Sequence, residues 1–92
     1  MSIKFKLTQY IIIYIGDSEL SNVILTSIIE FPSHPNINSN DFLEELKNKY
    51  TDIIIYENNK WTNNLYSNKY DYLLEKYSNI NKIKFEYFLE KK

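Results

Sequence analysis

Tyr10-Ile11-Ile12-Ile13-Tyr14-Ile15 is the stretch of sequence that decides the fold. β-Branched and aromatic residues pack well on a pleated surface, so six of them in a row predict a central β-strand. The pattern extends towards the N-terminus, because apolar residues recur at period two on one face: Ile3, Phe5, Leu7, Ile11, Ile13 and Ile15. Gln9 interrupts this row. Residues 3–15 are therefore predicted to form one long strand, or two strands joined by a bend near Gln9.

Length and composition limit what the chain can be. Its 92 residues suffice for one domain, residues 1–92, with a modest core. Cysteine is lacking, which excludes a disulfide framework and thiolate-bound metal. With 11 basic residues against 12 acids, no overall field draws the chain to nucleic acid or to an anionic membrane. Neither a membrane span nor a signal peptide is recognisable, so we expect a cytoplasmic protein. Abundant Ile, Asn, Lys and Tyr indicate an AT-rich genome.

The segment after the turn signal Gly16-Asp17-Ser18 has an ambiguous period. Read at period two, its apolar residues share one face of a strand over residues 22–31. Read at the helical period, a different set aligns: Leu20, Val23, Ile24, Ile28 and Phe31. The β-branched content and the preceding turn favour the strand, which makes residues 3–31 a hairpin. A helix over residues 20–31 is the alternative.

Two helices and two further strands complete the predicted order. The segment with Pro32 and Pro35 ends the hairpin in a loop, after which Asn40 or Asp41 caps the first helix. The predicted elements are a helix over 41–50, a strand over 53–56, a helix over 65–77 and a strand over 82–89. The run at 53–56 is continuously apolar, as in strands covered on both faces. We therefore place it beside residues 10–15 in the middle of the sheet.

The resulting order is strand, strand, helix, strand, helix, strand. Helices must cover an apolar sheet face, so this order predicts an α+β fold. We expect a two-layer sandwich in which a sheet of about four strands carries both helices on one face.

Enzymatic signatures are mostly lacking. A single glycine is too few for a phosphate-binding loop or a dinucleotide fingerprint. His34, the only histidine, is interpreted as a solvated loop residue rather than a general base. Asp52, Glu57 and Lys60 resemble a magnesium-nuclease cluster poorly, because the strand at 53–56 separates the two acids. We expect no catalytic residue, cofactor or metal; a metal-dependent nuclease or toxin is an alternative.

Lysines alternate with apolar residues in the first and last predicted strands. They are Lys4, Lys6, Lys82 and Lys84. If those strands are neighbours, four ammonium groups share a face that could follow a single-stranded nucleic acid. Arginine, which reads phosphate and guanine, does not occur in the chain. Lysines on strands also protect sheet edges from aggregation, and we favour that role over nucleic-acid binding.

Aromatic residues are the more informative excess. The chain has nine tyrosines, and tyrosine is frequent at the energetic centres of protein interfaces. Tyr72 lies off the apolar stripe of the second helix and is predicted to face outward. Tyr72 and Trp61 are therefore candidate anchors for a protein partner.

The hairpin 10–31, the helix 41–50 and the strand 53–56 together resemble the layout of many short accessory proteins of phages and mobile elements. That group includes inhibitors of host defence such as anti-CRISPR proteins. The resemblance implies a non-enzymatic viral inhibitor that blocks another protein stoichiometrically in the host cytoplasm. It also implies that surface acids imitate nucleic-acid phosphates: Glu44, Glu45, Asp71 and Glu75. An exposed first or last strand would additionally allow a homodimer.

Overall fold

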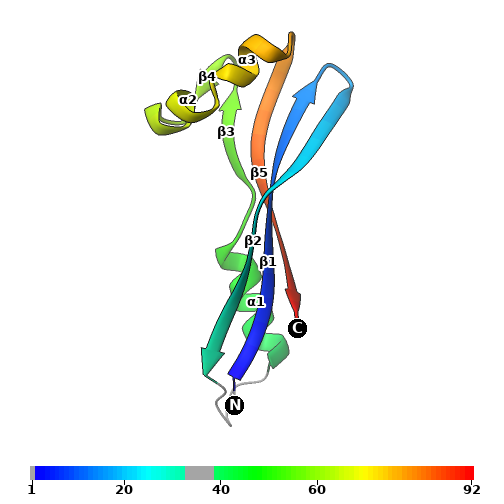
Figure 1. The fold of residues 1–92 in the computed structure, drawn as a ribbon, viewed down its shortest axis with the longest axis vertical. Helices are drawn as coiled ribbons and strands as arrows, with labels where there is room; N and C mark the ends of the chain where they lie inside the picture. The colour runs from blue at the N-terminus through cyan, green and yellow to red at the C-terminus, as the bar shows by residue number, and fades with distance from the viewer. Residues whose placement is uncertain (1, 33–38) are drawn as a thin grey trace.

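The structure, a computed structural model, describes residues 2–32 and 39–92 and shows a long twisted sheet with helices at its two ends (Figure 1). The strands are β1 (Ser2–Ile15), β2 (Ser18–Pro32), β3 (Ile53–Glu57), β4 (Lys60–Trp61) and β5 (Ile80–Lys91). The helices are α1 (Ser39–Lys49), α2 (Asn64–Tyr70) and α3 (Tyr72–Lys76). The sheet order is β2-β1-β5-β3-β4, and every neighbouring pair is antiparallel.

The α+β class is confirmed, but the count of elements differs from the prediction. The described residues form five strands rather than four and three helices rather than two. The additional strand, β4, pairs Trp61 with Tyr56 across a two-residue turn. Asn58 and Asn59 occupy that turn at φ 55° and 62°, a conformation that asparagine tolerates better than most residues. This asparagine pair was a hairpin signal that our sequence reading did not use.

Residues 18–32 form a strand, so the helical alternative for residues 20–31 is wrong. β1 and β2 make a hairpin whose turn contains Gly16 at φ 55°. β1 is continuous, and the irregularity near Gln9 lies in its pairing with β2. Gln9 pairs with Leu25 and Tyr10 with Val23, which leaves Ile24 as an extra, bulged residue.

The prediction that residues 10–15 and residues 53–56 form neighbouring strands is wrong. β5 lies between β1 and β3, with Ile83 opposite Ile13 on one side and Tyr56 on the other. β5 has 12 residues against the five of β3, so it offers β1 a much longer ladder. Ile53 and Ile54 of β3 are accordingly exposed. The first and last strands are both interior in this sheet order: β1 lies between β2 and β5, and residues 82–85 of β5 lie between β1 and β3.

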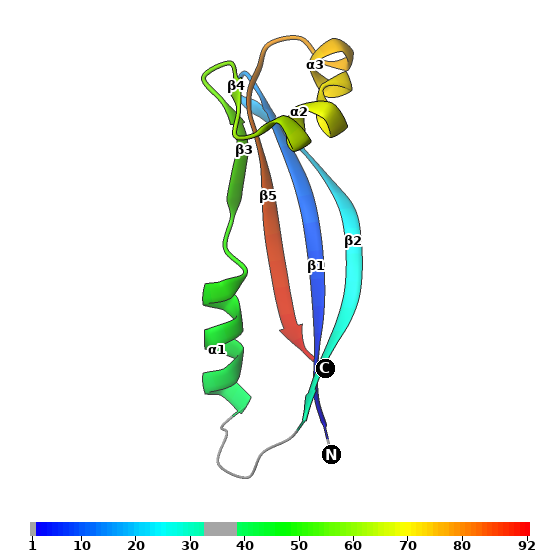
Figure 2. The ribbon, with the colours of Figure 1, turned by 90° about the vertical axis from the view of Figure 1, so that its left-hand side faces the viewer.

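All three helices pack on the sheet face that carries the odd-numbered residues of β1, which we call the covered face. The opposite face is called the open face. The lower cluster, under α1, has the buried residues Phe5, Leu7, Leu46 and Leu89. The upper cluster, under α2 and α3, has the buried residues Ile11, Ile13, Ile55, Tyr56, Tyr70, Leu73, Ile83 and Phe85. Figure 2 shows α1 at one end of the sheet and α2 with α3 at the other.

The helix boundaries also differ in detail. α1 begins at Ser39, so the predicted caps Asn40 and Asp41 lie in its first turn. The predicted single helix 65–77 is divided at Asp71, because Leu74 N–H donates to the Asp71 carbonyl three residues back, at 3.0 Å. This tighter turn changes the direction of the chain between α2 and α3.

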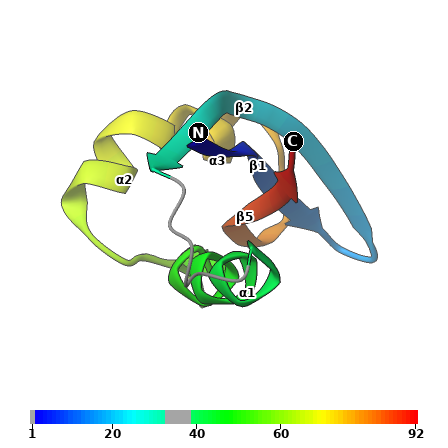
Figure 3. The same cartoon turned by 90° about the horizontal axis from the view of Figure 1, so that it is seen from below.

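The molecule is elongated, with extents of 52 × 25 × 18 Å. Its Cα radius of gyration is 16.4 Å, whereas a compact domain of this length has about 12 Å. Figure 3 shows the strands curling from β2 to β5, with α1 beside β5 and α2 on the left. Between the two helical ends, the covered face lacks a helix among the described residues.

Candidate functional site: the central pocket

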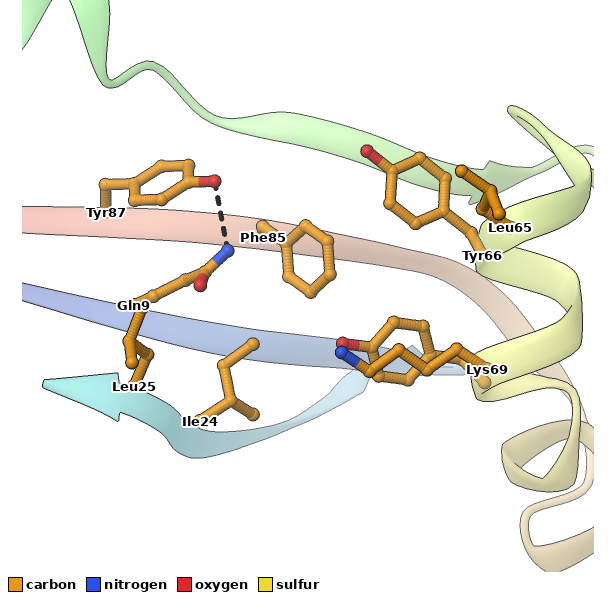
Figure 4. Close-up of a pocket in the computed structure, with 9 residues that line it drawn as sticks. Gln9, Ile24, Leu25, Leu65, Tyr66, Lys69, Phe85 and Tyr87 are labelled. Carbon is orange, nitrogen blue, oxygen red and sulfur yellow. Dashed lines mark hydrogen bonds between the residues drawn. The ribbon is translucent and has the colours of Figure 1, made fainter.

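A pocket of about 610 Å³ lies on the covered face between the lower and upper clusters. We call it the central pocket (Figure 4). Its lining residues come from β1, β2, β5 and α2: Gln9, Ile24, Leu25, Leu65, Tyr66, Lys69, Tyr70, Phe85 and Tyr87. The volume falls in the range of roughly 300–1,000 Å³ that is typical of binding sites.

The floor of the pocket is one row across the sheet, with Leu25, Gln9 and Tyr87 side by side on β2, β1 and β5. Gln9 Nε2 donates a hydrogen bond to the Tyr87 hydroxyl at 3.0 Å, as Figure 4 shows. The Tyr87 ring contacts both clusters. Gln9 lies in the apolar row of β1 at the point where the core divides into two clusters. A polar residue is tolerated there because its amide has a hydrogen-bond partner.

The bulge at Ile24 determines which side chains of β2 form a wall of the pocket. In a regular strand, two successive side chains point to opposite faces. Because Ile24 is bulged, Ile24 and Leu25 both line the pocket. Both remain exposed, so this wall lies open to solvent.

The opposite wall is built by α2. Asn63 begins that helix, since its Oδ1 accepts hydrogen bonds from the N–H groups of Leu65 at 2.9 Å and Tyr66 at 3.3 Å. Leu65 is 78% exposed at the pocket rim. Lys69 supplies the single cation of the lining, and its Nζ lies 5.4 Å from the centroid of the Tyr70 ring.

Aromatic rings close the upper end of the pocket. The Tyr66 and Tyr70 rings meet Phe85 edge to face, at centroid distances of 5.8 Å and 5.6 Å. The Tyr50 ring, after α1, lies 5.7 Å from Tyr87 at the lower end. The pocket is thus an apolar and aromatic hollow with a few hydroxyl groups, one amide and one ammonium group.

Burial raises the pKa of Tyr87 above the ordinary value of 10.0, and the neighbouring Tyr66, Tyr50 and Tyr70 raise it further. Below pH 10.0, Tyr87 is protonated in both the folded and the unfolded chain. As the pH rises towards the higher pKa of the folded state, the unfolded chain ionises first, so the folded state loses relative stability.

We expect Tyr87→Phe to lower the free energy of unfolding by about 1 kcal/mol at neutral pH, because Gln9 loses its hydrogen-bond partner. The difference between wild type and variant should shrink as the pH rises above 10.0. Urea unfolding over a pH series measures this. Tyr72→Phe, at an exposed ring, is the matched control and should have no effect at neutral pH. Equal stability of wild type and Tyr87→Phe at neutral pH would contradict the assigned hydrogen bond.

The two aromatic residues predicted to anchor a partner differ in exposure. Tyr72, at the start of α3, is 58% exposed, which confirms that it faces outward. Trp61 is half-buried, with its ring 4.9 Å from that of Tyr56. Within the described part of the chain, its indole N–H is buried and has no hydrogen-bond partner. Neither residue lines the central pocket.

The predicted acidic residues are exposed but do not form one surface. Glu44 and Glu45 lie on α1, whereas Asp71 and Glu75 lie at the other end of the molecule, on and beside α3 (Figure 1). Glu44 Oε1 is 4.0 Å from Lys47 Nζ, a weak surface ion pair. The fold therefore separates the acids into two pairs.

The predicted lysine face exists, since β1 and β5 are neighbours, but antiparallel pairing puts the lysines at opposite ends of it. Lys6 Nζ is 3.8 Å from Glu90, and Lys84 Nζ is 3.3 Å from Asp52. Lys4 lies opposite Glu30 of β2. Acids interrupt the basic residues, so the open face does not carry a continuous basic track.

Lys84 and Lys82 belong to a small polar cluster around Tyr14. Their Nζ atoms lie 5.7 Å and 5.1 Å from the Tyr14 ring centroid. Burial lowers the Lys84 pKa, but hydrogen bonds to Tyr14 and Asp52 outweigh it, so the pKa is raised above 10.5. Lys84 therefore stays charged at neutral pH and holds the end of β3 to β5.

The remaining candidate features are metal-binding acids, His34 and a membrane span. Within residues 2–32 and 39–92, no group of three or more His, Cys, Asp or Glu side chains is arranged to hold a metal ion. Asp52 pairs with Lys84, and Glu57 lies at the other end of β3. His34 lies outside the described residues. None of the helices that the structure describes is long and apolar enough to span a membrane.

No family model, curated protein or solved structure matches this chain. Sequence reasoning missed the central pocket as a site, although one signal was present. Gln9 is the single interruption of an apolar row, and a polar residue in such a row indicates either a bend or a hydrogen-bonded side chain. The α2 residues of the pocket had no such signal, because only the fold brings α2 over β1.

Proposed function

We propose that this chain is a non-enzymatic protein-binding protein, an inhibitor that blocks its partner stoichiometrically in the cytoplasm. The central pocket receives an aromatic or aliphatic side chain of the partner. The observation that carries the proposal is the pocket itself, an aromatic hollow in the middle of an otherwise elongated, thinly covered sheet. The likeness of the sequence layout to phage-encoded inhibitors supports the blocking role.

The exposure of the pocket rim favours a protein over a small molecule. Small-molecule sites bury roughly 70–90% of the ligand. Here Leu25 and Leu65, on opposite walls, are both exposed, so a small ligand would remain largely in water. An apolar rim around aromatic residues is instead what a protein interface covers. Tyr66 and Tyr87 offer ring surface and a hydroxyl group together, as tyrosines at interfaces do.

Lys69 defines the chemistry of the partner further. Among the lining residues that the structure describes, Lys69 is the single cation and none is an acid. A partner segment that inserts an aromatic side chain and presents a carboxylate beside it would satisfy both the rings and the ammonium group. We therefore assign an acidic, aromatic segment of another protein as the occupant.

The test is affinity capture from source cells with the tagged full chain, followed by measurement of stoichiometry. We expect one protein partner at a 1:1 ratio of chains. Leu65→Glu and Lys69→Glu should each weaken its binding by at least about tenfold, because they place an acid where the partner's apolar and acidic groups dock. Both side chains are at the helix surface, so circular dichroism should show an unchanged fold.

Tyr72→Glu is the matched control, since Tyr72 is exposed on α3 and does not line the pocket. Retained binding of Tyr72→Glu together with loss for Leu65→Glu supports the proposal. Loss for Tyr72→Glu with retention for Leu65→Glu would place the partner on α3 and overturn the pocket assignment. Capture of nucleic acid that is lost when Lys4, Lys6, Lys82 and Lys84 are changed to Gln would overturn protein binding.

A further inference from the structure

β2 has an outer edge with no neighbouring strand among the residues that the structure describes, because it is the last strand in the sheet order. It is also the longest strand, with 15 residues, which corresponds to roughly 50 Å. An edge strand presents unpaired backbone N–H and C=O groups that another strand can bind.

The side chains of β2 do not protect this edge. Five large aliphatic residues are 39–56% exposed: Leu20, Val23, Ile24, Leu25 and Ile28. The strand contains no lysine or arginine, and its charged residues, Glu19 and Glu30, lie near its ends. Natural edge strands usually carry lysines or inward charges against unwanted pairing. In this chain the lysines of β1 and β5 sit on interior strands and β2 has none, so the edge of β2 has the character of a surface that is covered.

We propose that a second copy of this chain covers the edge of β2, pairing β2 with β2 antiparallel about a two-fold axis at Thr26. Because Ile24 is bulged, Ile24 and Leu25 of each copy together lie opposite Ser27 of the other. Such a contact is isologous, so it closes at two copies instead of growing into a fibre. The two five-stranded sheets would become one ten-stranded sheet.

The bulge at Ile24 limits the registers in which the faces match. Val23 lies opposite Tyr10 and Ile28 opposite Lys6, so both side chains are on the open face although they are an odd number of positions apart. The two-fold axis sets Val23 of each copy opposite Ile28 of the other. On the covered face, the same register sets Leu20 opposite Phe31.

Charge also favours this register. Glu30 then lies opposite Ser21, and Glu19 lies opposite Pro32, so no acid faces another acid. A shift by two residues that brings Val23 opposite Thr26 keeps the faces aligned, but it sets Glu19 opposite Glu30 twice, and like charges directly opposite each other are destabilising. A shift by two residues in the other direction sets the Glu30 carboxylate opposite Val23 and shortens the ladder.

The size of the contact sets the expected affinity. Residues 19–32 take part on each copy, fewer than the roughly 20–30 residues a side of a standard interface. We therefore expect the dimer to form in the micromolar range of protein concentration.

Light scattering and sedimentation of the full chain across that range test the dimer. We expect wild type to show a concentration-dependent mass that approaches two copies. Ile28→Lys should raise the dissociation constant by at least about tenfold, because it puts an ammonium group against Val23 of the second copy. Tyr72→Lys, an equally exposed site outside β2, is the matched control and should dimerise as wild type does. A monomeric wild type at all these concentrations would overturn the proposal, and so would a dimer unaffected by Ile28→Lys.

Disulfide trapping tests the register, and the chain suits it because it has no cysteine. An equimolar mixture of Val23→Cys and Ile28→Cys should give a disulfide-linked dimer of the two variants under mild oxidation. Each variant alone should give far less. Equal yields in all three samples would overturn the assigned pairing. Leu65→Glu and Lys69→Glu should leave this dimer intact, so loss of the pocket's partner and loss of the dimer are separate results.

Discussion

Ile83→Ala is expected to lower the free energy of unfolding by about 3 kcal/mol. Ile83 is fully buried in β5, between Ile13 of β1 and Tyr56 of β3, so its side chain joins three strands of the upper cluster. Truncating it leaves a cavity that these strands cannot close without giving up ladder hydrogen bonds. Domains of this size are stable by roughly 5–15 kcal/mol, so the loss is a large share of the total.

Urea unfolding followed by circular dichroism, at one fixed protein concentration, measures the effect. Ile54→Ala is the matched control, because Ile54 is exposed on the neighbouring strand β3. The control should change stability by less than about 1 kcal/mol. Similar losses for the two variants would contradict the burial of Ile83 between β1 and β3.

Phe5→Ala is expected to cost about 4 kcal/mol, the larger effect, since it removes a fully buried aromatic ring. The Phe5 ring lies 6.1 Å from Phe42 of α1 and 6.4 Å from Phe31 of β2, and these two rings meet at 4.8 Å. The three rings hold α1, β1 and β2 together in the lower cluster. The lower cluster has few other buried residues, so α1 should become mobile.

Hydrogen exchange distinguishes this local effect from general destabilisation. Relative to wild type, Phe5→Ala should accelerate exchange at the amides of α1 more than at the amides of β3, which belongs to the upper cluster. Phe88→Ala provides the control with the same chemical change, at a ring that is exposed on the open face of β5. Uniform acceleration across both clusters would mean that the core is not divided in two.

The division of the core explains why the central pocket exists. The rows of side chains on either side of the Gln9–Tyr87 pair belong to different clusters, Leu7 with Leu89 below and Ile11 with Phe85 above. α1 covers one end and α2 with α3 the other, so none of the described helices lies over the row between them. In that row the Gln9 amide and the Tyr87 hydroxyl are hydrogen-bonded to each other.

The local pattern of the sequence was sufficient for most of the elements, although β4 and the division between α2 and α3 were not predicted. Alternation identified β1 and β5, a continuous apolar run identified β3, and β-branched content with the preceding turn favoured a strand for β2. Helical periodicity identified the regions of α1, α2 and α3. Outward-facing Tyr72 also followed from periodicity alone. These features depend on each residue's own neighbours along the chain, which is the information that a single sequence contains.

Tertiary structure alone decided which strands are neighbours and where the surfaces lie. Apolarity placed Ile53 and Ile54 in the middle of the sheet, yet β5 took that place because its ladder with β1 is much longer. In the same way the lysines of β1 and β5, which suggested sheet edges, became interior, and the apolar β2 became the edge. Which strands pair depends on the relative stability of ladders between segments far apart in the chain. The residues of one segment do not show which of these ladders is the most stable. The pocket between Gln9 and α2 follows from that pairing, and so does the free edge of β2.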